Sequence, residues 1–438
     1  MKNARQTAFD ILCKIQKDSS YSNLTVDSFL ASGDLNESDS AFVSALVYGV
    51  LESSFTLDYQ LASNLKQPLK KLKPQVLTIL RLGAYQLLFM DKVPESAAVN
   101  ESVKLSKANG CSFASGLINA VLRNVAKNGL CLPDISDKTL YYSVKYSFPE
   151  ELVKFWIKSY GEDNAVGIMS ACAGRPPLTV RTNTLKITTD ELIEALKNEG
   201  VDSVCSVADD SVELSKCGSV EKLKSFTDGL FHVQDAASQL CVAALDPGPD
   251  ETVLDLCAAP GGKSFTVAER MNNTGRIIAC DIHNHRLELI KSGASRLGIT
   301  NIECLINDAS LYNEDIPYAD KVLCDVPCSG LGIVRRKPEI RCKPLDGLKE
   351  LPPIQRQILD TASRYVKPGG RLVYSTCALN PKENENVCKD FLLSHTEFKS
   401  VIPTNICEST FIRDGFVTLM PHINGTDGFF IAVFEKEG

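Results

Sequence analysis

The first third of the chain carries apolar residues at intervals of three and four, the spacing of one face of an amphipathic helix. The pattern is clearest in three segments: FVSALVYGVLE (42–52), VLTILRLGAYQLLFM (76–90) and GLINAVLRNVAK (116–127). Asp39, Pro74 and Pro94 stand near the predicted helix starts, where acidic residues and proline are favoured. Residues 1–128 are therefore predicted to form an all-helical domain. It holds no cluster of acids or histidines, so we expect either a scaffold or a module that docks on or binds RNA.

Residues 129–240 follow a different pattern. Pro133 and the polar residues after it predict a linker. Beyond it, LTVRTNT (178–184) and SVELSK (211–216) have the composition of strands, and DELIEALKNEG (190–200) has the period of a helix. This part is predicted to be a linker followed by a small α/β domain, and it contains no recognisable catalytic cluster.

From residue 241 to residue 438, short β-rich runs alternate with helical stretches. The runs are ETVLDLC (251–257), GRIIACD (275–281), NIECLIND (301–308), DKVLCDV (320–326) and GGRLVYSTC (369–377). The helical stretches are KSFTVAERM (263–271), HRLELIKSGASRLG (285–298) and PIQRQILDTASRYV (353–366). This alternation predicts a doubly wound α/β fold with a mostly parallel sheet. VTLMPH (417–422) and FFIAVFE (429–435) predict a closing antiparallel hairpin.

A polar or reactive residue ends each predicted parallel strand: Asp255, Asp281, Asp308, Asp325 and Cys377. In open α/β sheets, ligands bind outside the carboxyl ends of the strands. We therefore expect these five side chains to line one crevice.

The composition limits the possible functions. No apolar run approaches the roughly 18 to 20 residues that span a bilayer, so we expect a cytoplasmic protein without a membrane partner. The 16 cysteines include no Cys-x-x-Cys pair and the five histidines do not cluster, so we expect no metal and no disulfides. The net charge of −7 argues against indiscriminate nucleic-acid binding. It leaves local sites open, such as the basic segments 66–73 and 335–349.

The segment VLDLCAAPGGKS (253–264) predicts a strand, a glycine-rich turn and a helix start. Gly261 and Gly262 allow backbone N–H groups to approach a ligand. Asp281 follows Gly262 by 19 residues, where a carboxylate can accept the ribose hydroxyls of a nucleoside. The turn lacks the Gly-x-Gly-x-x-Gly spacing of a dinucleotide site and is not a P-loop. Since Asp308 could accept a hydrogen bond from an adenine amino group, S-adenosylmethionine fits these residues best.

Two thiols stand at successive strand ends, Cys328 in DVPCSG and Cys377 in YSTC. Carbon 5 of cytosine is a poor nucleophile, but a thiolate that adds to carbon 6 makes the ring an enamine that attacks an electrophilic methyl group. A second group can then help to remove the carbon 5 proton and expel the thiol, and a carboxyl such as Asp325 can hydrogen-bond the ring nitrogen and amino group. The chemistry alone does not decide which cysteine attacks. A Pro-Cys dipeptide carries the nucleophile in DNA cytosine methyltransferases, which favours Cys328, and a further alternative is that both thiols are buried and inert.

Five blocks together closely resemble the Sun/RsmB family of bacterial rRNA cytosine-5 methyltransferases. They are VQDAASQ (233–239), DLCAAPGGKS (255–264), DVPCSGLGIVRRKPE (325–339), GGRLVYSTCALNPKENE (369–385) and TDGFF (426–430). The first third resembles the NusB-like helical domain that distinguishes this family from shorter RNA cytosine methyltransferases. The resemblance therefore covers essentially the whole chain. It implies a NusB-like domain (1–128), a linker and small α/β RNA-binding domain (129–240), and a Rossmann-like S-adenosylmethionine-dependent methyltransferase domain (241–438).

The resemblance also implies a role for each site residue. Cys377 is the nucleophile, Cys328 assists breakdown of the adduct, and Asp325 lies between cofactor and base. The implied contacts to S-adenosylmethionine are Cys257, Ala258, Ala259, Pro260, Gly261, Gly262, Lys263, Asp281, Asp308 and Asp325. The family usually has alanine where this chain has Val326, a position that we expect to pack without affecting activity.

The implied substrate is a specific cytosine of 16S rRNA, free or in an early small-subunit particle, and we expect the enzyme to be a monomer. A base inside a helix cannot reach the site, so the target must be unpaired or flipped out. The basic residues that follow Cys328 are placed to hold the flanking phosphates: Arg335, Arg336, Lys337, Arg341 and Lys343.

Three alternatives stay open at the level of sequence. The enzyme could methylate tRNA or another rRNA nucleotide, against which only the N-terminal domain argues. The NusB-like segment could belong to a non-catalytic RNA-binding or antitermination factor, but the complete cofactor loop and both thiols speak against that. An NAD-dependent oxidoreductase on the same kind of sheet is disfavoured by the glycine spacing.

Overall fold

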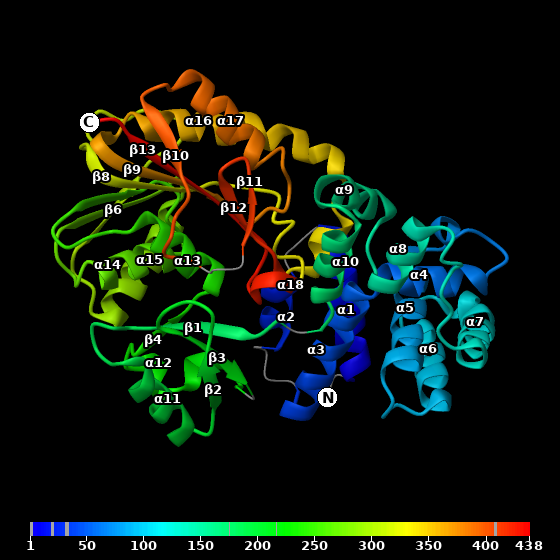
Figure 1. Ribbon diagram of the computed structural model, residues 1–438. Helices are drawn as coiled ribbons and strands as arrows, with labels where there is room; N and C mark the ends of the chain where they lie inside the picture. Colours follow the sequence, from blue (N-terminus) through cyan, green and yellow to red (C-terminus); the bar gives the residue numbers. More distant parts are fainter. Residues whose placement is uncertain (1–2, 19–21, 31–34, 175, 216, 407–409) are drawn as a thin grey trace. The chain divides into compact units, whose positions relative to one another are not determined.

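The computed structural model describes residues 3–18, 22–30, 35–174, 176–215, 217–406 and 410–438 (Figure 1). Contacts divide the chain into two compact units. Unit 1 is Met1–Ala173 with Arg336–Lys343, and unit 2 is Gly174–Arg335 with Pro344–Gly438. The predicted domain boundaries after residues 128 and 240 do not coincide with this division and stay predictions.

Unit 1 is helical throughout its regular structure. Its α-helices are α1 (Ala4–Asp18), α2 (Ser22–Leu30), α3 (Glu37–Glu52), α4 (Ser54–Ser63), α5 (Pro74–Phe89), α6 (Glu95–Ala108), α7 (Ser115–Asn128), α8 (Lys138–Tyr146), α9 (Glu150–Tyr160) and α10 (Glu162–Ala171). Asn36 caps α3 by accepting a hydrogen bond from the Asp39 N–H, and proline opens α5. One apolar face of each of the first seven helices, except the partly described α2, supplies several buried residues to a common core.

Helices α8 to α10 lie within residues 129–240, for which the sequence predicts a linker and a small α/β domain. They belong to unit 1. Trp156 and Phe148 are fully buried and meet edge to face, with ring centroids 5.3 Å apart. Burial of such large rings stabilises a helical arrangement that local composition did not reveal.

Unit 2 begins with a small antiparallel sheet of order β2-β3-β1-β4. Its elements are β1 (Leu178–Thr182), α11 (Thr189–Asn198), β2 (Asp202–Cys205), β3 (Ser211–Ser215), α12 (Lys224–Thr227) and β4 (Phe231–Val233). A capping box between Thr188 and Glu191 starts α11. The strands and the helix predicted here are therefore confirmed, and Lys216, the last residue of the second predicted strand, lies outside the described residues.

The rest of unit 2 is built on a nine-stranded sheet of order β11-β12-β13-β9-β8-β5-β6-β7, with β10 paired to β13. Its strands are β5 (Thr252–Asp255), β6 (Arg276–Asp281), β7 (Ile302–Ile306), β8 (Ala319–Asp325), β9 (Val366–Thr376), β10 (Phe398–Val401), β11 (Phe411–Arg413), β12 (Phe416–Leu419) and β13 (Phe429–Lys436). Its helices are α13 (Ala236–Leu245), α14 (Gly262–Arg270), α15 (Asn284–Leu297), α16 (Leu351–Ser363), α17 (Glu385–Ser394) and α18 (Pro421–Asn424).

Strands β5 to β9 pair in parallel, whereas β13 runs antiparallel to β9, β10 and β12. The predicted doubly wound, mostly parallel sheet is thus confirmed. The predicted closing pair is antiparallel as expected, with α18 between its two strands.

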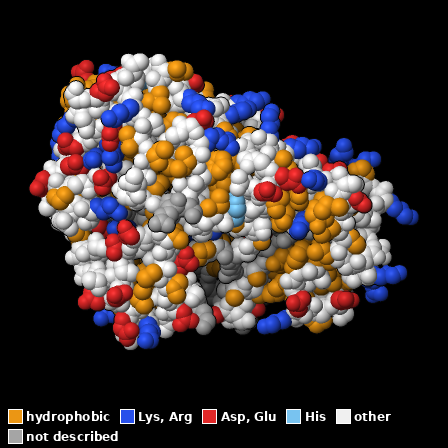
Figure 2. Space-filling view, viewed as in Figure 1, with side chains coloured by type: hydrophobic (Ala, Val, Ile, Leu, Met, Phe, Trp, Pro, Cys, Tyr) orange, Lys and Arg blue, Asp and Glu red, His pale blue; other side chains and the backbone are white. Residues whose placement is uncertain are grey.

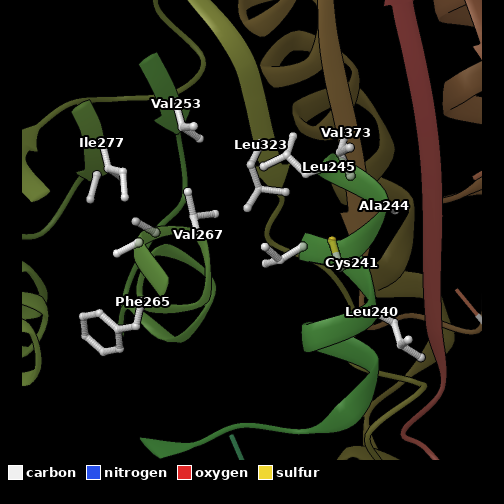
Figure 3. Close-up of a cluster of buried hydrophobic side chains, with 14 of the residues drawn as sticks. Leu240, Cys241, Ala244, Leu245, Val253, Phe265, Val267, Ile277, Leu323 and Val373 are labelled. Carbon is white, nitrogen blue, oxygen red and sulfur yellow. The ribbon is translucent and has the colours of Figure 1, made fainter. Parts of the chain in front are cut away.

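Helices cover both faces of this sheet (Figure 1): α13, α14 and α15 lie on one side, and α16 and α17 lie on the other. Figure 3 shows Cys241 and Leu245 of α13 beside Leu323 and Val373 of the strands. Each fully buried aliphatic side chain contributes about 1.5–3 kcal/mol relative to exposure. The helices packed on both faces therefore stabilise the sheet, and the sheet fixes the positions of the residues at its strand ends.

Within the described ranges, no single helix is long and apolar enough to cross a membrane. Among the described helices, α3 and α4 would together be long and apolar enough to cross a membrane, but they are bent by 74° at their junction. Both helices contribute buried residues to the core of unit 1. No disulfide joins any cysteine in the part of the chain that the structure describes.

Candidate active site

The sheet order reverses at β5. The chain runs outward from β5 to β6 and β7, then returns to add β8 and β9 on the other side of β5. Such a reversal separates the loops that follow neighbouring strands, and it is where open α/β sheets bind ligands. The loop after β5 carries the predicted cofactor residues Cys257 to Lys263, and the loop after β8 carries Cys328.

The loop after β5 holds the predicted cofactor residues Cys257 to Lys263. Its backbone is fixed by hydrogen bonds from the Ala258 N–H to the Cys280 carbonyl and from the Gly261 N–H to the Ala258 carbonyl, both 2.8 Å. Gly261 has φ +111°, and a Cβ atom there would lie 2.5 Å from the Phe265 ring. Only glycine fits this position, which confirms the physical reason for the turn.

Two carboxylates flank this loop. Asp255 is buried and accepts a hydrogen bond of 2.7 Å from the Ser264 hydroxyl. Burial raises the pKa of Asp255 to about 6, although that hydrogen bond acts in the opposite direction. Asp281 is also buried and accepts from the His283 N–H at 2.9 Å and from Arg286 Nη1 at 2.8 Å.

Asp308 and two apolar residues lie at the next strand ends. One Asp308 oxygen accepts from the backbone N–H and from the hydroxyl of Ser310, at 2.9 and 2.7 Å, which fixes the carboxylate after β7. Ile282 and Ile306, which sequence analysis did not single out, are 54% and 57% exposed at the ends of β6 and β7. Exposed apolar side chains beside a carboxylate suit the flat face of an adenine ring.

A lysine connects the two loops. Lys263 Nζ lies 2.6 Å from Asp325 Oδ2, and the Ser375 hydroxyl donates to Asp325 Oδ1 at 2.9 Å. Burial tends to lower the pKa of Lys263, but the charge and hydrogen bond of Asp325, together with nearby Cys241 and Asp255, outweigh burial and hold that pKa above its usual value. The ammonium group also lies 5.1 Å from the centre of the Phe429 ring. Asp325 is thus held as an oriented carboxylate with a cation beside it.

The two thiols lie side by side beyond the ends of the neighbouring parallel strands β8 and β9. Cys328 Sγ is 3.2 Å from Cys377 Sγ. The Gly332 N–H donates to the Cys377 carbonyl at 2.9 Å, which ties the two loops together. The hydrogen bond with Cys377 and then burial raise the pKa of the Cys328 thiol well above its usual value. A raised pKa makes the Cys328 thiol harder to ionise, and the thiolate is the nucleophilic form of cysteine.

Val326, the position at which the chain departs from the family pattern, is 3% exposed and packs in a hydrophobic cluster on the sheet. It packs as expected. In the described part of the chain, no group of three or more His, Cys, Asp and Glu side chains is arranged to hold a metal ion.

Two of the predicted RNA-binding residues require a correction. Arg335 is 7% exposed and forms an ion pair of 2.5 Å with Asp427, with Asp235 at 3.7 Å. Arg341, in unit 1, is 3% exposed and donates to the carbonyls of Glu52 and Cys172 at 2.8 and 3.1 Å. Buried guanidinium groups with these partners are not available to phosphates, so both arginines are structural residues.

The other basic candidates are more accessible. Arg336 and Lys337 are half-buried and Lys343 is exposed, as are the lysines of the segment 66–73. Over the described residues on the face shown in Figure 2, Lys and Arg side chains are interspersed with Asp and Glu and form no single broad basic patch.

Comparison with known proteins places this site in a family. The model of 16S rRNA methyltransferase RsmB/F matches residues 242–435, the NusB family matches residues 2–127, and a ferredoxin-like domain of RsmF/B-like methyltransferases matches residues 148–221. A Bacillus subtilis (strain 168) protein named "Probable ribosomal RNA small subunit methyltransferase B" is 37% identical, over 100% of this chain and 99% of its own length. The chain belongs to the RsmB family.

Solved structures agree with this assignment. The structure of PH0851 superimposes with a TM-score of 0.84 at 27% identity, covering 100% of this chain and 99% of its own. The structure of NSun6 from Pyrococcus horikoshii with SFG has a TM-score of 0.61 at 25% identity, covering 67% and 99%. The RsmB-family chain is therefore an RNA methyltransferase with a NusB domain, a ferredoxin-like domain and a Rossmann-like catalytic fold. The non-catalytic alternative fails, because the NusB family accounts only for residues 2–127.

Proposed function

We propose that the protein methylates carbon 5 of a specific cytosine in 16S rRNA, with S-adenosylmethionine as methyl donor and a cysteine adduct as intermediate. The observation that supports this most is the 3.2 Å pair of thiols, Cys328 and Cys377, beyond the ends of the two strands that carry Asp325 and Ser375. Two adjacent thiols with no metal-binding group around them, among the described residues, suit the formation and breakdown of a covalent adduct.

The residues around the loop after β5 fit the cofactor. Asp281 would accept the ribose hydroxyls, Ile282 and Ile306 would pack on the adenine ring, and the unshared oxygen of Asp308 would accept from its amino group. S-adenosylmethionine, when bound, supplies an electrophilic methyl group. NSun6 of Pyrococcus horikoshii, which was solved with the S-adenosylmethionine analogue SFG, lends support.

Asp325 is suited to recognise the base. With Lys263 and Ser375 fixing its two oxygens, the carboxylate can accept a hydrogen bond from the cytosine amino group. Uracil carries a carbonyl oxygen at that position, so it would face the carboxylate with an acceptor. Lys263 also stabilises the negative charge that moves into the ring when a thiolate adds to it.

Cys377 and Cys328 would then share the covalent chemistry. The Cys377 thiolate adds to carbon 6, forming the C–S bond and making carbon 5 nucleophilic. Once carbon 5 is methylated, its proton is removed and the C–S bond breaks, restoring the aromatic ring and releasing Cys377. Cys328 Sγ lies 3.2 Å from Cys377 Sγ, beside the adduct. Once Cys328 has lost its own proton to solvent, its thiolate takes the carbon 5 proton and Cys377 leaves as a thiolate.

The RNA substrate rests on the family and on the domains. The relative from Bacillus subtilis carries small-subunit rRNA in its name. The exposed lysines of segment 66–73 and Lys343 are the candidates for phosphate contacts. We also propose that the enzyme acts as a cytoplasmic monomer on 16S rRNA, free or in an early small-subunit particle.

Bisulfite sequencing of 16S rRNA tests the substrate. A strain that lacks the gene should lose methylation at one cytosine, and the gene encoding the natural chain should restore it, whereas one encoding Cys377→Ala should not. Unchanged 16S rRNA together with a lost methyl group in tRNA would transfer the activity to tRNA and overturn the rRNA proposal.

A further inference from the structure

Two adjacent residues after β9, Glu383 and Asn384, form hydrogen bonds with the residues that flank Cys328 and Cys377 in the chain. Both side chains are fully buried, at 0% exposure. They belong to the block that ends PKENE, and their side-chain hydrogen bonds reach the residues beside the two cysteines. Buried polar side chains are costly unless hydrogen-bonded, so their partners indicate what they are for.

Glu383 holds the loop that presents Cys328. Its Oε2 accepts from the Ser329 N–H at 2.8 Å and from Gln355 Nε2 at 3.0 Å. The same Gln355 nitrogen donates to the Pro327 carbonyl at 2.9 Å. The residues immediately before and after Cys328 are thus fixed by one carboxylate and the amide bound to it.

Asn384 holds the turn that presents Cys377 in the same manner. Its Oδ1 accepts from the Thr376 hydroxyl at 2.6 Å, and its Nδ2 donates to the Ala378 carbonyl at 2.7 Å. Again the residues immediately before and after the cysteine are bound to one side chain. Because Glu383 and Asn384 are neighbours in the chain, the positions of the two thiols are set by a single dipeptide.

We propose that Glu383 and Asn384 are positioning residues that set the two thiols independently, Glu383 for Cys328 and Asn384 for Cys377. The inference rests on the proposed adduct chemistry and extends it to residues outside the reacting groups. A displacement of about 1 Å can cost on the order of 100-fold in rate. Disturbing each residue should therefore reproduce, in milder form, the loss of the cysteine that it serves.

Glu383→Gln tests the first assignment. Both Glu383 oxygens accept hydrogen bonds, Oε2 from Ser329 and Gln355 and Oε1 from Asn380 Nδ2 at 2.7 Å. A glutamine has one oxygen and one NH2 group, so in either orientation its nitrogen meets a donor and the network around the Cys328 loop is disturbed. With Cys328 displaced, breakdown of the adduct slows. We expect denaturing gels of enzyme incubated with S-adenosylmethionine and 16S rRNA to show an accumulated protein–RNA adduct, with kcat lowered ~10- to 100-fold and KM for S-adenosylmethionine within twofold.

Asn384→Ala tests the second assignment and should have the opposite effect on the adduct. With Cys377 displaced, addition to the ring slows, so the adduct and the turnover should fall together. Glu385→Gln is the matched control: Glu385 is 2% exposed and also lies at the start of α17, but its ion-pair partner is Arg413, at 3.8 Å. It should leave the amount of adduct unchanged.

A double variant separates positioning from general damage. Asn380→Asp combined with Glu383→Gln exchanges the acid and the amide, so that each donor again meets an acceptor and the net charge is unchanged. The double variant should lose the accumulated adduct and regain most of the turnover. Binding of S-adenosylmethionine by calorimetry checks that each variant is folded.

Three results would overturn the positioning proposal: wild-type turnover and adduct in Glu383→Gln, loss of adduct in both Glu383→Gln and Asn384→Ala, or no rescue by the exchange. The proposed function fails separately. If Cys328→Ala traps no adduct in the same assay, the covalent roles are wrong; if it does and Glu383→Gln does not, only the positioning role is wrong.

Discussion

Lys263 Nζ lies 2.6 Å from Asp325 Oδ2, so the lysine that closes the cofactor loop is ion-paired to the acid proposed to face the base. The Lys263 side chain is only 11% exposed. At that burial, removing one partner leaves an uncompensated charge, which is strongly unfavourable. This pair joins the predicted cofactor residues to the predicted catalytic residues.

We expect Lys263→Met to lower kcat/KM for RNA methylation by ~10²-fold, because the carboxylate loses the cation that orients it and the ring loses a stabilising charge. Single-turnover methylation with tritiated S-adenosylmethionine measures the effect. Lys321→Met is the control, since Lys321 lies on β8, the strand that ends at Asp325. Its side chain is 16% exposed, and its Nζ lies 3.8 Å from Glu251 Oε1. Equal activity of both variants would contradict a role for Lys263.

The pKa of Asp255 predicts an unusual dependence of stability on pH. Burial raises it to about 6, so the folded state favours the protonated carboxyl and loses stability as pH rises from the ordinary value near 4 through 6. Asp255→Asn has no charge to bury. Above pH 7 the variant should be more stable than the natural chain by up to about 3 kcal/mol, and the difference should shrink toward pH 4.5.

Thermal unfolding of the cofactor-free protein at several pH values measures this difference. Asp320→Asn should behave in the opposite way. Burial raises the pKa of Asp320, but the hydrogen bonds from Lys367 and from the Thr252 N–H, together with the charge of Lys367, outweigh burial and hold that pKa below its usual value. The stabilisation is therefore present at neutral pH and fades in acid. A stability difference for Asp255→Asn that does not change with pH would show that folding leaves the pKa of Asp255 unchanged, which contradicts the raised value.

The buried ion pairs of Arg335 predict that its replacement affects stability rather than RNA affinity. Arg335→Met leaves Asp427 buried without its cation, which should cost about 3–5 kcal/mol of unfolding free energy. The dependence of RNA affinity on salt should keep its slope. Lys343→Met, at an exposed position, should lower that slope by ~1. A reduced slope in a folded Arg335→Met protein would restore the phosphate role.

The parallel sheet and its strand-end residues could be predicted because they depend on local patterns. Strands β5 to β9 each occupy a short β-rich run, and the turn at Gly261 follows from the backbone freedom of glycine. The proximity of Cys328 and Cys377 follows from parallel strands that end at one edge. That edge was predicted from the strand pattern alone.

The errors and omissions concern partners that are distant in sequence. Arg335 reads as part of a basic segment, but its partner Asp427 is 92 positions away. Glu383 was overlooked because two of its hydrogen-bond partners, Ser329 and Gln355, are 54 and 28 positions away. Composition and period carry no information about such pairs. Only the order of strands in the sheet brings them together.

The central claim is that Cys377 attacks the base and Cys328 releases it. Purified Cys328→Ala and Cys377→Ala enzymes, incubated with S-adenosylmethionine and 16S rRNA, are compared on denaturing gels. We expect Cys328→Ala to accumulate a protein–RNA adduct that survives denaturation, and Cys377→Ala to form no adduct and no 5-methylcytosine. An adduct with Cys377→Ala and none with Cys328→Ala would contradict the assignment and reverse the two roles.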